Sequence, residues 1–143
     1  MRCLVLLLLA AFALAEEHHH HAAHGGVLNE IGSCAHGHAE VKIEGTRLRL
    51  WFVGGGHHTD DAVRIPEREV FLTDATGRRI TLQPTPLVIA EETVGDCSAF
   101  AGEAPWLAGL AEGRLTGSVT FKGKPVTLVI TWPEGFEADV PGK

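Results

Sequence analysis

The side chains best suited to chemistry lie near the N-terminus, where residues 18–40 hold seven of the nine histidines. This segment reads HHHHAAHGGVLNEIGSCAHGHAE, and it also contains Cys34 and Glu40. Imidazole, thiolate and carboxylate groups are the usual protein ligands of divalent transition metals. The one methionine is Met1, so a thioether Cu(I) site is disfavoured. Zn(II), Cu(II) or Ni(II) is therefore the expected metal.

The run CAHGHAE at 34–40 is the best candidate for a folded metal site. His36, His38 and Glu40 alternate with small residues, and on a β-strand such side chains project from one face. We expect these three and His24 to form the ligand set. The same alternation is typical of a plain solvent-exposed face, so that interpretation stays open.

A run of four histidines precedes this candidate site: His18, His19, His20 and His21. Such runs bind divalent metals loosely, and this one is expected to capture ions for the folded site. If the chain is cut after Ala15, His18 becomes the third residue. It can then close a square-planar Cu(II) or Ni(II) site with the free amine and two backbone nitrogens. A solvated tail is the alternative.

Two further histidines, His57 and His58, lie in the glycine-rich segment GGGHHTDD together with Asp60 and Asp61. They can complete a metal site if the fold brings this loop to the first group. A solvated turn is the alternative, because aspartate-rich loops usually face water.

The first 15 residues, MRCLVLLLLAAFALA, have a positive start, an apolar stretch and an A-x-A cleavage signal. They are expected to be a secretory signal peptide, and the stretch is too short to span a membrane. The mature protein is then periplasmic or secreted, without membrane insertion. Because exported proteins meet oxidising conditions, Cys34 and Cys97 are predicted to form a disulfide. Metal ligation by Cys34 is the alternative.

The elements that must position these side chains are short strands. Residues 16–25 are polar and non-periodic, which predicts a flexible His-rich arm. In residues 47–53, RLRLWFV, apolar and polar side chains alternate as in a strand with one buried face. Further strands are predicted at 26–32 and 38–45, in hairpins over 67–84 and 114–132, and at 86–91. Residues 92–113 are expected to be a loop with a short helix within 104–113.

About seven short strands with almost no helix predict an all-β domain over residues 26–143. An immunoglobulin-like β-sandwich is the expected architecture, and a small barrel is the alternative. The formal net charge of −6 argues against nucleic acid as a partner. HExxH, GxSxG and a phosphate-binding glycine loop are absent from the sequence, so we do not expect an enzyme.

The segments HGGVLNEIG, HAEVKIEG and SAFAGEAPWLAGLAEGRLTGSVTFKGKPVTL carry a resemblance to a loose group of small secreted bacterial proteins. The resemblance covers residues 24–129 and implies a compact β-sandwich with a metal-related role in the cell envelope. His24 with Gly25 and Gly26, and His38 with Glu40, match the shared pattern. The His-rich arm, His36 and the two cysteines depart from it.

The sequence therefore predicts an exported protein that binds a divalent transition metal, either to buffer it or to transfer it to an envelope transporter. The alternative is a structural or protein-interaction domain of the envelope whose metal binding is incidental. Such a domain would hold its partner through a sheet edge or through surfaces bearing Trp51, Trp106 and Trp132.

Overall fold

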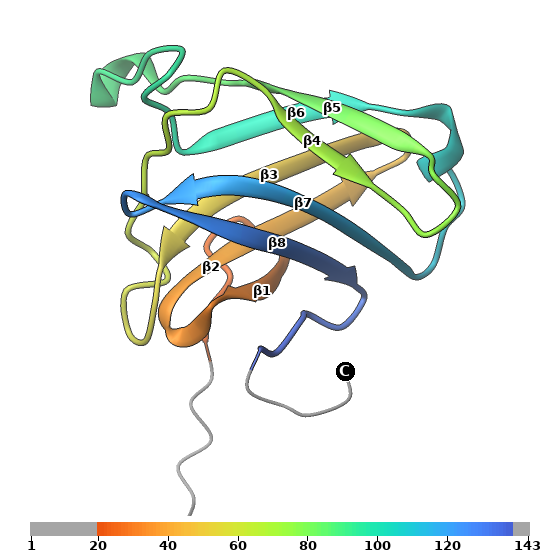
Figure 1. Ribbon diagram of the computed structural model, residues 1–143, viewed down its shortest axis with the longest axis horizontal. Helices are drawn as coiled ribbons and strands as arrows, with labels where there is room; N and C mark the ends of the chain where they lie inside the picture. Colours follow the sequence, from red (N-terminus) through yellow and green to blue (C-terminus); the bar gives the residue numbers. More distant parts are fainter. Residues whose placement is uncertain (1–19, 139–143) are drawn as a thin grey trace, which may run out of the picture.

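A computed structural model describes residues 20–138 of the chain. Eight antiparallel strands form one sheet in the order β1-β2-β3-β6-β5-β4-β7-β8 (Figure 1). The strands are β1 (Val27–Ile31), β2 (Ser33–Glu44), β3 (Arg47–Gly54), β4 (Val70–Thr73), β5 (Arg79–Pro84), β6 (Ala99–Glu103), β7 (Gly113–Phe121) and β8 (Lys124–Trp132). Two short 3-10 helices, η1 (Val88–Ala90) and η2 (Pro105–Leu107), lie between strands. The predicted signal peptide (1–15), His18 and His19 lie outside the described residues.

The sheet curls until its edge strands, β1 and β8, approach each other. The segment that follows β8 fills the remaining gap, because the backbone N–H of Glu30 donates to the carbonyl of Phe136 at 2.8 Å. The buried Asn29 side chain adds a second link, since its Oδ1 accepts from the N–H groups of Thr131 and Phe136 at 2.7 and 2.8 Å. The all-β prediction is confirmed. The immunoglobulin-like sandwich of seven strands is not, because one eight-stranded sheet nearly closes into a barrel.

The core fills the inside of this curled sheet. On β3, Leu48, Leu50 and Phe52 point inward and are fully buried, as the alternation in the sequence predicts. The Phe52 ring meets the rings of Phe100 and Phe121 at centroid distances of 5.9 and 6.3 Å. Burial of large apolar side chains is the main favourable term in folding. The contact with Phe100 joins the neighbouring strands β3 and β6, and the contact with Phe121 joins β3 to β7 across the interior of the near-barrel.

Two segments differ from the sequence-based expectation. Strand β6 lies in a stretch predicted to be a loop, because only Phe100 of its five residues has a large inward-facing side chain. The apolar segment at 86–91 forms η1 instead of a strand, and Val88 and Ile89 remain 81% and 89% exposed. The helix expected within 104–113 is reduced to η2. No helix in residues 20–138 is long and apolar enough to cross a membrane.

A buried carboxylate anchors the loop that carries η1. Glu92 is 6% exposed, and it accepts hydrogen bonds from the backbone N–H of Leu87 at 2.9 Å and of Ser98 at 3.2 Å. The Ser98 hydroxyl and the Cys97 thiol also donate to it. Burial raises the pKa of Glu92, but the donors from Leu87, Ser98 and Cys97 outweigh it and hold the pKa below its ordinary value of 4.5.

This anchor makes the stability of the fold depend on pH. A carboxyl whose pKa is depressed on folding stabilises the folded state above the unfolded-state pKa, and this contribution is lost as pH falls through the folded-state value. We therefore expect the Glu92→Gln variant to be less stable than the native protein at about pH 7, and the difference to shrink by about pH 3. Urea unfolding at both pH values measures it. A difference that does not change with pH would contradict this role for Glu92.

Candidate metal centre

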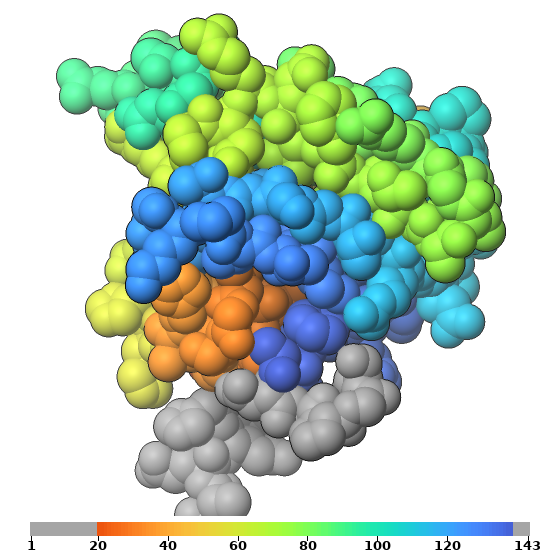
Figure 2. Space-filling model, in the orientation of Figure 1, coloured from red at the N-terminus to blue at the C-terminus, as the bar shows by residue number. Residues whose placement is uncertain are grey.

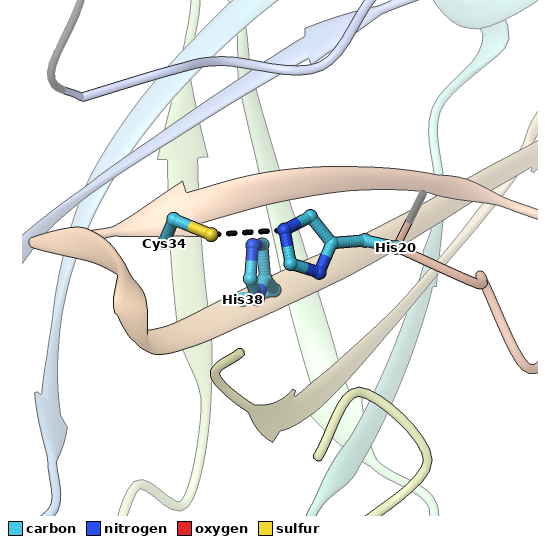
Figure 3. Close-up of side chains that lie close together, drawn as sticks. All are labelled: His20, Cys34 and His38. Atoms are coloured by element: carbon cyan, nitrogen blue, oxygen red, sulfur yellow. Dashed lines mark hydrogen bonds between the residues drawn. The ribbon is translucent and has the colours of Figure 1, made fainter. Parts of the chain in front are cut away.

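Three potential metal ligands, His20, Cys34 and His38, converge on one point at the start of β2 (Figure 3). One ligand atom of each residue lies within 4.8 Å of the other two. The Cys34 Sγ is 2.9 Å from Nε2 of His20. Two imidazoles and one thiol thus face a common space, which is the donor set expected of a transition-metal site.

A bulge in β2 brings Cys34 and His38 together. Residues four apart on a flat strand stand about 13 Å apart. Here Glu30 of β1 pairs with His38, whereas the next residue, Ile31, pairs with Ser33. Five residue steps of β2 thus lie opposite one step of β1, and such a bulged register bends the strand. Gly55 permits the close packing, because a Cβ there would lie 2.2 Å from the Ala35 carbonyl oxygen.

Backbone carbonyls orient both imidazole rings. Nδ1 of His20 is 3.0 Å from the carbonyl oxygen of Gly56, and Nδ1 of His38 is 3.2 Å from that of Gly54. A carbonyl oxygen only accepts hydrogen bonds, so each Nδ1 carries the proton and each Nε2 keeps its lone pair. Metal-binding histidines are commonly fixed by an acceptor of this kind on the nitrogen that does not bind the metal.

His38 is the most enclosed member of this cluster, with 2% of its surface exposed. Burial lowers the pKa of His38 below its ordinary value of 6.5, more than the hydrogen bond to Gly54 raises it. The proximity of His20 lowers the pKa further. His38 is therefore a neutral imidazole at neutral pH, which is the form that binds a metal ion.

The N-terminal segment reaches the cluster because Glu40 holds it against β2. Glu40 is fully buried, and its Oε1 accepts from the backbone N–H groups of His24 at 2.9 Å and Gly26 at 2.8 Å. Its Oε2 lies 2.8 Å from Nδ1 of His24. The His24 ring stacks on Trp51 at a centroid distance of 4.3 Å. We call this set of contacts the Glu40 latch.

The two glycines after His24 make the latch sterically feasible. Gly25 has a φ of +69°, in the left-handed region that favours glycine. A Cβ on Gly26 would lie 2.5 Å from the carbonyl oxygen of Val41, so only glycine lets the backbone approach β2 this closely. Within residues 20–25, which the sequence predicts to be part of a flexible arm, His20 and His24 contact residues of the sheet and the loop after β3.

Of the predicted ligands, the structure brings His38 and His20 into the cluster. His24 and Glu40 bind each other in the latch, and the His36 ring packs edge-on against Phe121 at 5.3 Å. The remaining described histidines lie elsewhere. His21 Nδ1 is 3.8 Å from Asp60, His58 Nδ1 is 2.9 Å from Asp61, and His57 is exposed in the same loop.

Within residues 20–138 no disulfide joins Cys34 to Cys97, so the predicted bond is not seen. Cys34 belongs to the cluster at the start of β2, whereas the Sγ of the fully buried Cys97 lies 3.1 Å from the carbonyl oxygen of Ala99. Burial raises the pKa of the Cys97 thiol, and the nearby Glu92 carboxylate raises it further. The prediction rested on the compartment and on the number of cysteines, which do not fix where the two side chains lie.

A cavity of about 280 Å³ adjoins the cluster. His20 and His38 line it, together with two carboxylate side chains, Glu30 and Glu137. Glu30 is the cross-strand partner of His38, and its Oε2 accepts from the N–H of Ala138 at 2.7 Å. The cavity gives a small ion access to both imidazoles past negatively charged groups.

Comparisons with protein families, with curated proteins and with solved structures find no match to this chain. The described fold and the donor set of the cluster are therefore the basis on which a function can be inferred.

Proposed function

We propose that this protein binds one divalent transition-metal ion through His20, Cys34 and His38. The observation that carries the proposal is the convergence of three ligand atoms within 4.8 Å of one another. Both imidazoles are also oriented by backbone carbonyls before any metal arrives. Such preorganisation favours binding, because little rotational freedom of the side chains remains to be lost.

Zn(II) suits this donor set best. Thiolate and imidazole are both good Zn(II) ligands, and a tetrahedral ion held by three protein ligands keeps one position open. Cu(II) and Ni(II) compete for the two imidazoles, and Cu(II) exceeds Zn(II) in intrinsic affinity for most sites. The metal that the protein carries thus also depends on which ion its compartment supplies.

We further propose that the exported protein buffers this metal or transfers it to an envelope transporter. The three-ligand site supports this role, because an open coordination position allows a competing ligand to attack the bound ion. The cavity that holds Glu30 and Glu137 beside His20 and His38 gives such a ligand a route of approach. Its carboxylates also attract cations by long-range electrostatics.

Native mass spectrometry of the untagged protein, titrated with Zn(II), Cu(II) and Ni(II), tests the site. We expect a single one-metal species with Zn(II). Replacing His20 with alanine should weaken binding by at least about 10- to 100-fold, the effect of losing an outer-sphere partner alone, whereas the neighbouring His21→Ala change should leave it unaltered. A ladder of weak adducts, or equal effects of the two substitutions, would contradict a folded site.

A second candidate function, that of a protein-interaction domain, is favoured by one observation. The loop that carries η1 exposes Leu87, Val88, Ile89 and Val94, and it projects from the body of the molecule (Figure 2). The tryptophans do not supply such a surface among residues 20–138. Trp51 lies beneath His24, Arg78 covers Trp106, and Trp132 is 9% exposed.

Replacing both Val88 and Ile89 with serine separates the two functions. If interaction is the main role, this variant should fail to complement a deletion strain while its Zn(II) affinity stays unchanged. If metal handling is the main role, the variant should complement fully, and His20→Ala should not.

A further inference from the structure

A cavity of about 540 Å³ lies over the outer face of β3 and β6, and it involves none of the three proposed metal ligands. Its lining includes Trp51 and Arg49 of β3, Ala99 and Ala101 of β6, and Leu87 from the loop before η1. Ligand sites in proteins are typically concave, largely apolar and a few hundred Å³ in volume, with a few polar groups that fix orientation. We call this cavity the β3–β6 trough.

The floor of the trough is apolar and shaped by unequal side chains. In the sheet register, Trp51 pairs with Ala99 and Arg49 pairs with Ala101, so long side chains of β3 stand beside small ones of β6. The Glu40 latch holds the His24 ring in place, and this ring stacks on Trp51 with an angle of 2° between the two ring planes. The stacking fixes the orientation of the Trp51 side chain. A flat apolar group can therefore lie on the alanines beside Trp51.

Positive charge gathers at one end of the trough. Arg47 and Arg49 project from the same face of β3, and no hydrogen bond or ion pair within residues 20–138 involves either guanidinium. Arg47 is in register with Glu44 and Glu103 but forms no ion pair with them. The register neighbours of Arg49 are Lys42, which pairs with Glu44 at 3.5 Å, and Ala101. The charge of Arg49 thus has no described counterion in a chain of net charge −6.

The other end of the trough carries acidic side chains, and one wall is apolar. Asp60 and the buried Glu92 line that end. Glu92 also positions the wall, because it binds the backbone N–H of Leu87 at 2.9 Å and so holds this apolar side chain over the trough. A ligand with one anionic group at the arginine end fits this polarity, whereas a second anionic group at the other end would be repelled.

We propose that the β3–β6 trough binds a small organic anion with a flat apolar body, of the aromatic carboxylate class. A guanidinium presents N–H donors in a planar fork that matches a carboxylate, and such charge-assisted hydrogen bonds are stronger than neutral ones. The aromatic body would lie beside Trp51 on the alanine floor, where ring contacts and burial contribute. This site is separate from the proposed metal site and does not depend on it.

Titration of the metal-free, ¹⁵N-labelled protein with 1-naphthoate, followed by NMR, tests the proposal. We expect saturable shifts at the Trp51 indole N–H and at the amides of Ala99 and Ala101. The neutral analogue 1-naphthamide should bind about tenfold more weakly, since it lacks the charge that the guanidinium recognises. Arg49→Gln should weaken naphthoate binding by a similar factor.

Two further variants make the result decisive. Arg68→Gln is the matched control, because Arg68 is equally a surface arginine but does not line the trough, and it should leave binding unchanged. Ala101→Leu fills the floor without changing charge, and it should abolish binding while the rest of the spectrum stays native. Equal affinity for naphthoate and naphthamide, equal effects of the two arginine changes, or shifts centred elsewhere would overturn the proposal.

Discussion

Replacing Cys34 with serine is expected to weaken Zn(II) binding by about 100-fold or more, and to leave the fold intact. The thiolate is the softest donor in the cluster and the only one that brings a negative charge to the ion. Loss of an outer-sphere partner alone lowers metal affinity by about 10- to 100-fold, so loss of a direct ligand should have at least this effect. Cys34 is only partly buried, so a serine there should be tolerated.

Co(II) provides the sharpest measurement, because it occupies Zn(II) sites and a thiolate bound to it gives a near-ultraviolet charge-transfer band. The native protein should show this band, and Cys34→Ser should lack it. Cys97→Ser is the matched control, since it removes the other cysteine of residues 20–138, which lies outside the cluster. An unchanged band in Cys34→Ser, or the same loss in both variants, would show that Cys34 is not a ligand.

Replacing Glu40 with alanine is expected to lower the free energy of unfolding by about 3 kcal/mol or more. Glu40 is fully buried and accepts two backbone hydrogen bonds, and it also contacts Nδ1 of His24. Its removal leaves the N–H groups of His24 and Gly26 without their acceptor and opens a cavity beneath the N-terminal segment. The free energy of unfolding of Glu40→Gln should lie between those of the native protein and of Glu40→Ala, because the amide keeps one acceptor oxygen.

Urea unfolding of Glu40→Ala beside Glu44→Ala gives a matched comparison. Both glutamates lie on β2, but Glu44 is exposed and forms a surface ion pair with Lys42 at 3.5 Å, so its removal should change stability by less than about 1 kcal/mol. Because the latch holds the segment that carries His20, Glu40→Ala should also weaken Zn(II) binding by about tenfold under conditions where the protein is folded. Equal stability of the two variants would show that the latch contributes nothing to folding.

The sequence predicts the strands better than it predicts their assembly. Alternation in residues 47–53 identifies β3 and its buried face, because one side chain in two is large and apolar. The same rule misses β6, where alanine and glycine occupy most positions. Near-closure of the sheet depends on a contact between Asn29 and residues about a hundred positions away, which local periodicity does not encode.

For the metal centre, the sequence indicates the right segment but not the right partners. His36, His38 and Glu40 share a strand face in the flat-strand interpretation, yet the bulge in β2 brings Cys34 close to His38. The N-terminal segment then covers His38 and Glu40, which are only 2% and 0% exposed. The adjacent Gly25 and Gly26 were the available signal, because paired glycines mark a place where the backbone turns or approaches another strand closely.

The closure of the sheet by residues 133–136 has a consequence for self-association. An edge strand with free N–H and C=O groups is a template on which another chain can add a strand, and this is a common route to fibrils and to strand exchange between copies. In this protein the N–H of Glu30 on β1 already donates to the carbonyl of Phe136. The Asn29 side chain also links β1 to the end of β8, because it accepts a hydrogen bond from the N–H of Thr131. A second copy would have to displace both contacts before it could pair. We therefore expect the seam between β1 and β8 to resist aggregation through strand addition.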